Sequence, residues 1–350
     1  MKLKLNPLDT TVVGSFPTTP FYAVNQDFPP YTPTVPEGEP YVDDPFLPGV
    51  FQALKLQHDA GIDFPSYGQP QDMCSMFLGS LIGYGLDYSQ GFQVVGDIEV
   101  PRSIPAIEYL QVSKRYFSMR GIKMPLTGPI TLAASLKVGS KAAIEYPEVV
   151  EQLARFVGSV AASYDKAGAD IISVDEPSLV YGLYVGMEPE FCTEMINTAL
   201  SPITRALSSI HACGQLNANT TDILLSTTAR VLDHEFASIP LNMTAYSRDD
   251  LESEEKLLGY GCIISNMEPV QLLEIQKDGN WKRVVESKKL IKKRIDDAIS
   301  LWGKENLILD PDCGFGGLRG YIKGLLTEEV AMRICFEKLK LMVDSKKEMA

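Results

Sequence analysis

Short runs of apolar and β-branched residues alternate along this chain with longer amphipathic stretches. Runs such as TTVVGS at 10–15 and DIISVDEP at 170–177 have the length and composition of buried strands. Segments between such runs, for example 146–169 and 281–306, repeat apolar residues at helical spacing. The strand-like runs number eight, at 10–15, 61–68, 122–129, 170–177, 208–214, 229–236, 261–266 and 306–314. This alternation predicts an α/β fold with a parallel sheet, and eight units favour a (β/α)8 TIM barrel over an open, doubly wound sheet.

Two segments interrupt the alternation. Residues 17–49 are rich in proline and aromatic side chains, which predicts an irregular excursion, either a surface wrap or a lid over one end of the barrel. Residues 84–101 have the pattern of an inserted hairpin. Because no linker divides the rest, we expect residues 1–350 to form one domain.

Composition narrows the class of protein. The 350 residues carry a formal net charge of −13, which argues against a nucleic acid or an anionic membrane as partner. The first residues lack the apolar run of an export signal, and no stretch is apolar for long enough to span a membrane. We therefore expect a cytoplasmic enzyme, whose six scattered cysteines are reduced thiols available as ligands.

Polar residues with useful chemistry come last in most of the strand-like runs. In a barrel these ends meet at the C-terminal mouth, where active sites are built. His211 and Cys213 end one run in HAC, and Cys313 ends another in DPDCG. Residues i and i+2 of an extended chain point to the same side, so His211 and Cys213 can share a ligand. One nitrogen and two thiolates indicate a zinc site, which needs a fourth ligand or an open position.

A fourth ligand is available in VLDHEFA, where His234 and Glu235 end the following strand. Neighbouring residues of a strand face opposite ways, so only one of the two points inward. Cys262 is a rival ligand, but its strand continues beyond it, which favours a core position.

Several motifs, in order along most of the chain, resemble the catalytic half of cobalamin-independent methionine synthase. The single-domain archaeal-type members are most similar, because the long N-terminal half of the folate-dependent enzymes is absent. The motifs are TTVVGSFP, DMCSMF, VVGDI, PLTGPIT, SVDEPSL, HACGQ, DHE and LDPDCG.

The resemblance implies a zinc-dependent methyltransferase that methylates a small thiol, most simply homocysteine to give methionine. The family's Zn2+ ligands fall on His211, Cys213, Glu235 and Cys313. Zinc binds a thiol as its thiolate, which is the better nucleophile. The family's homocysteine-binding residues fall on Val13, Gly14, Ser15 and Asp175, with Gln69 near a position where the family has a glutamate.

The chain departs from the family around the substrate. Gln69 and Gln71 stand where the family has a carboxylate, and Val180 or Tyr181 replaces a second glutamate. Asn266 stands near the histidine proposed as proton donor. Fewer carboxylates would also suit a thiol without an amino group, so methyl or alkyl transfer to coenzyme M is an alternative, with Arg319, Lys137 or Lys141 as the partner of the sulfonate. A zinc-stabilised binding protein is an alternative from a non-enzyme class.

The methyl donor is predicted from a second set of departures. The folate-dependent relatives have an arginine-cysteine pair before the motif VVGDI and a tryptophan after LTGPIT, whereas this chain reads DYSQGFQ and LAASLKV there. Without the tryptophan there is no evident platform for a pterin ring. We therefore expect a methylated corrinoid, or a corrinoid protein, as the donor.

Overall fold

Six parallel strands form the central sheet, in the order β10-β9-β8-β7-β6-β3. The computed structural model describes residues 5–18, 44–89, 91–102, 104–322 and 324–349. Most residues of these strands are buried, as expected when helices cover a parallel sheet. The strands are β3 Lys123–Thr127, β6 Ile171–Asp175, β7 Leu207–His211, β8 Val231–Glu235, β9 Leu257–Ile263 and β10 Leu307–Pro311.

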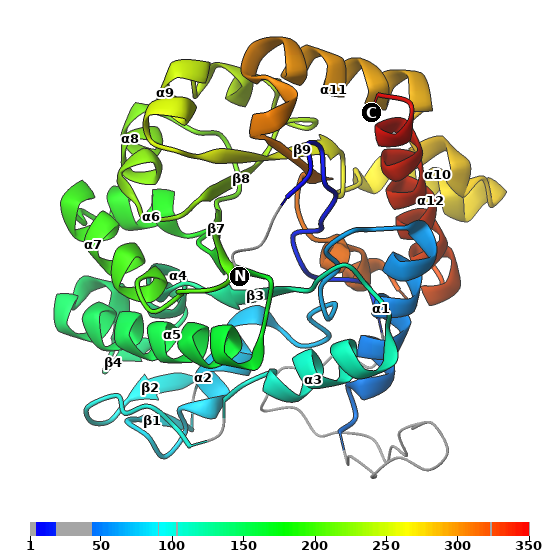
Figure 1. Ribbon diagram of the computed structural model, residues 1–350. Coiled ribbons are helices and arrows are strands. Elements are labelled where there is room, and N and C mark those ends of the chain that lie inside the picture. The colour runs from blue at the N-terminus through cyan, green and yellow to red at the C-terminus, as the bar shows by residue number, and fades with distance from the viewer. Residues whose placement is uncertain (1–4, 19–43, 90, 103, 323, 350) are drawn as a thin grey trace.

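Helices surround the strands (Figure 1). The predicted helix at 146–169 is α5, which begins with Pro147 and ends before Gly168, whose φ of 87° suits a residue without a side chain. The α-helices are α1 Leu47–Ala60, α2 Met73–Ser80, α3 Ile107–Tyr116, α4 Pro129–Ala134, α5 Pro147–Ala167, α6 Leu179–Tyr184, α7 Pro189–Leu200, α8 Ala218–Ser226, α9 Arg248–Ser253, α10 Pro269–Asp278, α11 Lys288–Trp302 and α12 Glu328–Lys347. The 3-10 helices are η1 Ala143–Glu145, η2 Pro240–Thr244, η3 Trp281–Val284, η4 Lys304–Asn306 and η5 Phe315–Tyr321.

The two remaining strand-like runs, 10–15 and 61–68, form single parallel bridges instead of named strands. Thr10 bridges to Leu309 of β10, and Thr11 bridges to Phe64. Ser66 then bridges to Lys123 at the other edge of the sheet. Segments 10–11 and 64–66 thus connect the two edge strands of the six-stranded sheet.

Two other predicted boundaries differ from the structure. The strand predicted at 261–266 lies at Leu257–Ile263, because Leu257 and Leu258 also pair with β8. The single helix predicted at 281–306 is divided into η3 and α11. Ser287 accepts a hydrogen bond from the Leu290 N–H and caps a new helix there.

A small second sheet lies outside the main one, in the order β1-β2-β4-β5. Its first two strands pair antiparallel within the segment where we expected an inserted hairpin. The strands are β1 Leu86–Tyr88, β2 Phe92–Val94, β4 Lys137–Val138 and β5 Lys141–Ala142. Most of the proline-rich excursion predicted at 17–49 lies outside the described residues, and its last residues belong to α1.

Among the helices of the described segments, none combines the length and the apolar character needed to cross a bilayer.

Candidate functional site

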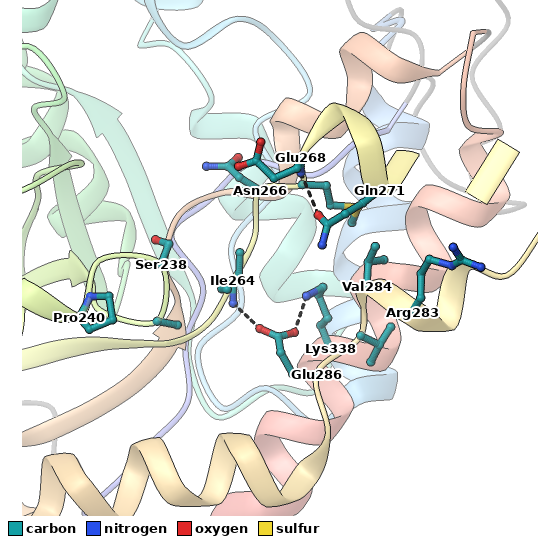
Figure 2. A pocket seen from close by; sticks show the side chains of 13 residues that line it. Ser238, Pro240, Ile264, Asn266, Glu268, Gln271, Arg283, Val284, Glu286 and Lys338 are labelled. Atoms are coloured by element: carbon teal, nitrogen blue, oxygen red, sulfur yellow. Dashed lines mark hydrogen bonds and ion pairs between the residues drawn. The ribbon is translucent and has the colours of Figure 1, made fainter. Parts of the chain in front are cut away.

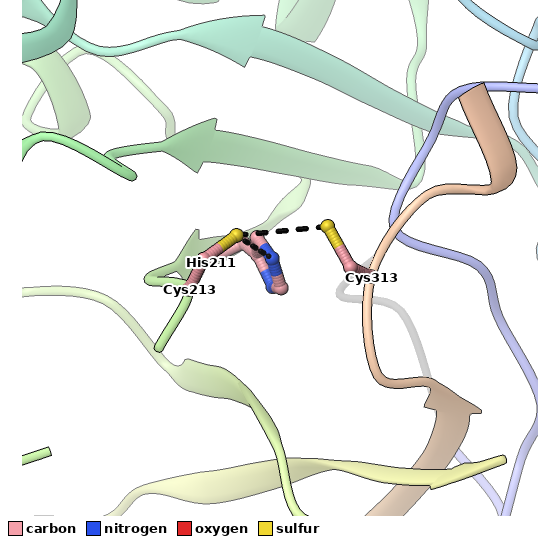
Figure 3. Close-up of side chains that lie close together, drawn as sticks. All are labelled: His211, Cys213 and Cys313. Atoms are coloured by element: carbon pink, nitrogen blue, oxygen red, sulfur yellow. Dashed lines mark hydrogen bonds between the residues drawn. The ribbon is translucent and has the colours of Figure 1, made fainter. Parts of the chain in front are cut away.

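His211, Cys213 and Cys313 lie together where strands β7 and β10 end (Figure 3). His211 Nε2 is 3.0 Å from Cys213 Sγ, and the two sulfur atoms are 3.6 Å apart. All three ligand atoms fall within 4.8 Å of one another. The strands run in parallel, so residues far apart in the sequence meet where the carboxyl ends of the strands lie side by side.

The three side chains fit a zinc ion. Two atoms that each lie about 2.0–2.3 Å from one zinc ion cannot be more than about 4.6 Å apart, and the two distances above satisfy this limit. The donor set of one imidazole and two thiols is typical of zinc. The pKa of the Cys313 thiol lies well below its ordinary value because Cys213 donates a hydrogen bond to it, and the pKa of Cys213 is raised for the same reason. One sulfur of the pair is therefore disposed to be a thiolate.

Asp233 orients His211 within this group. Its carboxylate Oδ1 lies 2.9 Å from His211 Nδ1, which leaves Nε2 to face Cys213. Its other oxygen accepts a hydrogen bond of 2.9 Å from the ammonium of Lys123, a residue of β3 with no exposed surface. Burial alone would raise the pKa of Asp233, but Lys123 and His211 outweigh burial and lower it. A metal-binding histidine is commonly held in this way by a carboxylate.

Sequence reasoning missed both Asp233 and Lys123. The alternation that faces Glu235 inward also faces Asp233 inward, since the two are separated by one residue of β8. For Lys123, the available signal was a charged residue within the otherwise apolar run IKMPLTGP. Asp310 of β10 completes this interior group: it is fully buried, and burial together with the charge of Asp233 raises its pKa well above the ordinary value.

Glu235 ends β8, and it does not belong to the group of three ligand atoms that lie within 4.8 Å of one another. Its Oε1 accepts a hydrogen bond of 3.1 Å from the N–H of Gly214, the residue after Cys213. Its Oε2 accepts one of 3.1 Å from the hydroxyl of Ser238. His234 points the other way, where its ring stacks on Tyr246 in the core.

The predicted substrate residues of the first segment lie close to the loop that carries Cys313. The backbone N–H of Gly316 donates a hydrogen bond to Ser15 Oγ, and Phe315 N–H donates to the Ser15 carbonyl. Gln69 packs against the same segment, because a Cβ placed on Gly14 would lie 2.5 Å from its Oε1. Gln69 has a positive φ of 38°, a strained conformation often found at functional sites. Val13 is buried.

The side chains of Asp175, Gln69 and Arg319 are close enough to Tyr67 to influence the pKa of its hydroxyl. Burial raises the pKa of Tyr67 above its ordinary value, and the negative charge of Asp175 raises it further. A hydrogen bond with Gln69 and the positive charge of Arg319 act in the opposite direction. Asp175 itself is buried at the end of β6, and loss of solvent raises its pKa to about 7. Arg319 Nη2 donates a hydrogen bond of 2.5 Å to the Gln69 carbonyl.

The other candidate residues lie elsewhere. Lys137 and Lys141 belong to the small outer sheet. Asn266 follows β9 and is exposed, and its Oδ1 would lie 3.3 Å from a Cβ placed on Gly317. Cys262 is buried in the core, with its sulfur 3.5 Å from the carbonyl oxygen of Asp310. Of the three candidates for a sulfonate partner, Arg319 is thus the one next to the predicted substrate residues.

Residues 8–324 match the family model described as the catalytic domain of cobalamin-independent synthase. The chain belongs to this family. A methionine synthase from Methanocaldococcus jannaschii is 29% identical over 97% of this chain and 98% of its own. One from Methanothermobacter marburgensis is 28% identical over 87% of this chain and 92% of its own. The family that the motifs predicted is therefore confirmed, and the predicted enzyme class, a methyltransferase with a thiol acceptor, agrees with the names of the relatives.

Solved structures of the family share the fold. A B12-independent methionine synthase from Shewanella, in complex with selenomethionine, aligns with a TM-score of 0.68 at 17% identity and covers 98% of both chains. A putative vitamin-B12-independent methionine synthase from Listeria monocytogenes aligns with a TM-score of 0.61 at 17% identity over 86% of both chains.

The predicted methyl donor is wrong. By its description the family is independent of cobalamin, so a methylated corrinoid or corrinoid protein is not its partner. The prediction relied on the missing tryptophan of the folate-dependent relatives. A ring can also be held by apolar side chains and amides elsewhere, so the loss of one aromatic residue does not identify a different donor.

Proposed function

We propose that this protein transfers a methyl group to the thiol of homocysteine and so forms methionine. The observation that carries the proposal is the group formed by His211, Cys213 and Cys313, in a chain of the cobalamin-independent methionine synthase family. A relative from Nitratidesulfovibrio vulgaris is named 5-methyltetrahydropteroyltriglutamate–homocysteine methyltransferase and is 30% identical over 52% of this chain, which is 24% of its own length. By that name, the donor that we propose is a methylated tetrahydropteroylglutamate.

His211, Cys213, Cys313 and Glu235 would hold a zinc ion. When bound, zinc lowers the pKa of a thiol and keeps the substrate sulfur as a nucleophilic thiolate. Asp233 keeps His211 Nε2 turned toward Cys213. The hydrogen bonds from Gly214 and Ser238 hold the Glu235 carboxylate beside the three other side chains.

Residues of the first segment and of β6 would bind the amino acid. The backbone of Val13, Gly14 and Ser15 lines the substrate, with Gln69 packed against it, and Asp175 takes the ammonium group. Arg319, which donates a hydrogen bond to the Gln69 carbonyl, suits the carboxylate. The substrate is thereby held at both charged ends, which fixes the direction of its thiol.

The proposed reaction moves a methyl group from a nitrogen atom of the donor to the sulfur atom of homocysteine. The thiol loses its proton, and a bond forms between the homocysteine sulfur and the methyl carbon. The bond between that carbon and the donor nitrogen breaks, its electron pair stays on the nitrogen, and the nitrogen takes up one proton. The products are methionine and the demethylated donor.

We also propose that the main sheet closes into a (β/α)8 barrel and that residues 1–350 form one domain. Both ideas are supported by the bridges that link segments 10–11 and 64–66 to the edge strands. In such a barrel the polar ends of the strands face one mouth.

The test combines metal analysis with an acceptor assay. Purified protein is expected to hold about one zinc per chain and to methylate homocysteine, but not coenzyme M, which lacks an ammonium for Asp175. Cys313→Ser should lose the zinc and the activity, whereas Cys74→Ser, at a half-buried cysteine away from the group, should keep both. A Cys313→Ser protein with its full zinc content would contradict the ligand assignment, and methylation of coenzyme M alone would contradict the acceptor.

A further inference from the structure

Asp312 is a buried carboxylate between the candidate metal centre and the loop that follows β8. It directly precedes Cys313, and only 1% of the residue is exposed. Its Oδ1 accepts the N–H of Phe236 at 2.9 Å and that of Ala237 at 2.8 Å. Its Oδ2 accepts the N–H of Ser238 at 2.6 Å. One side chain therefore binds three consecutive backbone N–H groups of this loop.

Asp312 reaches the loop across β9. The strand order is β10-β9-β8, and Asp312 directly follows β10, so β9 lies between it and the loop after β8. Gly261 of β9 leaves the necessary space, since a Cβ placed on it would lie 2.5 Å from Asp312 Oδ1. A buried carboxylate is strongly unfavourable unless it accepts hydrogen bonds, and the loop supplies three. The carboxylate and the loop therefore fix each other's position.

The far part of the loop borders open space. The ring of Phe236 packs in the core, with its centroid 5.0 Å from that of Tyr260. Ser238 and Pro240, further along the loop, line a cavity of about 450 Å³ (Figure 2). Ser238 is exposed, so core packing does not fix it, whereas its N–H bond to Asp312 does.

A chain of hydrogen bonds leads from Asp312 to the carboxylate of Glu235. The hydroxyl of Ser238 donates to Glu235 Oε2 at 3.1 Å. The other oxygen, Oε1, accepts the N–H of Gly214, the residue after Cys213, at 3.1 Å. The two oxygens of this carboxylate are thereby connected to two different loops: Oε1 to the one that carries Cys213, and Oε2, through Ser238, to Asp312.

Asn242 holds the main chain of Glu235 but not its carboxylate. The amide of this buried residue donates to the Glu235 carbonyl at 2.7 Å and to the Gly214 carbonyl at 3.0 Å. These bonds keep the backbone of Glu235 beside Gly214 without any contribution from Asp312. The direction of the carboxylate, in contrast, depends on the Gly214 N–H and on the hydroxyl of Ser238.

We propose that Asp312 is a positioning residue, which holds the Glu235 carboxylate in the direction it needs to serve as the fourth zinc ligand. It acts through Ser238 and is not itself a ligand, because its oxygens face the N–H groups of the loop. This inference rests on the proposed function and deepens it, since it names a residue on which the proposed zinc site depends.

The test is a double-mutant cycle on zinc affinity, measured by competition with a chelator. Asp312→Asn replaces one accepting oxygen by an NH2 group, and it should lower the affinity by roughly tenfold or more, the usual effect of removing an outer partner of a metal ligand. In a Glu235→Ala background the same substitution should change the affinity by less than about twofold, because the side chain on which Asp312 acts is gone. An equal effect in both backgrounds would overturn the proposal.

Asp165→Asn is the matched control. Asp165 is also buried, and its carboxylate also accepts three consecutive N–H groups, those of residues 204–206 before β7. These residues lie at the end of β7 opposite to His211. Asp165→Asn should therefore destabilise the protein to urea about as much as Asp312→Asn does, but leave its zinc affinity unchanged. A comparable loss of zinc affinity in the control would mean that general loosening of the fold is responsible, which contradicts a specific role of Asp312.

Ser238→Ala serves if Asp312→Asn does not fold. The side chain is exposed, so its loss leaves the core intact but removes the hydrogen bond to Glu235 Oε2. Zinc affinity should fall by about fivefold, the equivalent of one ordinary hydrogen bond, and should not fall in the Glu235→Ala background. Wild-type affinity in Ser238→Ala would overturn the proposal.

Failure of this inference and failure of the proposed function give different results. If the wild-type protein binds zinc and methylates homocysteine, but Asp312→Asn acts equally in both backgrounds, only the inference fails. If the predicted coupling to Glu235 is found but the wild-type protein does not methylate homocysteine, only the proposed acceptor fails. If the wild-type protein binds no zinc, both fail.

Discussion

Asp233 fixes the orientation of His211 in the candidate metal centre. It bonds His211, 22 positions before it, and Lys123, 110 positions before it, and all three are buried. The lysine gives the buried carboxylate a counter-charge, without which an ionised group in the interior is strongly unfavourable. The orientation of His211 on β7 therefore depends on a residue of β3, two strands away in the sheet.

We predict that Asp233→Asn weakens zinc binding by roughly 10- to 100-fold, the usual effect of removing a carboxylate behind a metal-binding histidine. Competition with a chromophoric chelator measures the affinity. Because the substitution leaves Lys123 buried without its counter-ion, the double variant Lys123→Met with Asp233→Asn should recover stability but not zinc affinity. Wild-type affinity in the double variant would refute the role of the carboxylate.

Glu286 gives a prediction about pH. Burial would raise its pKa, but the ammonium of Lys338 and the Ile264 N–H outweigh burial, so the pKa in the folded protein is below 4.5. In a carboxyl group whose folded pKa is depressed, the contribution to stability is present above the unfolded pKa and is lost as pH falls through the folded value.

Glu286→Gln should therefore destabilise the protein at pH 7, by about 3 kcal/mol as for other broken buried ion pairs. The difference from the wild type should shrink as the pH is lowered below about 4.5, the ordinary pKa of glutamate. Urea unfolding at a series of pH values measures both effects. A difference that stays constant from pH 7 to pH 3 would show that Glu286 is not ionised in the fold.

At the scale of the elements, β9 makes room for the polar ends of its neighbours. A Cβ on Gly259 would lie 2.8 Å from the Cβ of Asp233, and one on Gly261 would lie 2.5 Å from Asp312 Oδ1. Gly259 and Gly261, which have one residue between them, thus leave space on the same side of the strand. The position of Asp233 depends on a neighbouring strand that has no side chain there.

Gly259→Ala should shift Asp233, cost about 1–3 kcal/mol of stability and lower zinc affinity, because the added methyl group has no space. Gly96→Ala is the matched control, since a Cβ there meets nothing within 4 Å. Thermal unfolding and chelator competition are the measurements. If Gly259→Ala behaves like the control in both, the close approach of β9 does not determine the centre.

The pattern of apolar and polar residues predicted most of the strands and helices, but it predicted their first and last residues less well. Runs of buried residues gave β3, β6, β7, β8 and β10 with small shifts. The sequence could not show that 10–15 and 61–68 form only single bridges, because pairing depends on the partners' backbones. For the site, the spacing of His211 and Cys213 predicted that their side chains lie together, and they do. The hydrogen bonds of Asp233 to His211 and Lys123 join residues distant in the chain, which a pattern of neighbouring residues does not reveal.

At the scale of the whole molecule, the proposed closure of the barrel predicts slow amide exchange in segments outside the named strands. Thr11 N–H donates to the Leu309 carbonyl at 2.9 Å, and Phe64 N–H donates to the Thr10 carbonyl at 3.0 Å. If these bonds close the sheet, both amides should exchange with deuterium as slowly as those of β7 and β8. Mass spectrometry of peptides from 9–16 and 61–68 measures this. Exchange at the rate of exposed loops would refute closure.

The bridge between Thr10 and Leu309 also sets an order of events during synthesis. The ribosome releases Thr10 early, but the strand that pairs with it is made almost 300 residues later, at roughly 5–20 residues per second. Until then the first segment, with Ser15 and its neighbours, has no β10 to pair with, and the loop with Cys313 does not exist. The nascent chain therefore carries only His211 and Cys213 of the proposed zinc ligands for a time, and under this proposal the full set can form only after translation has passed Cys313.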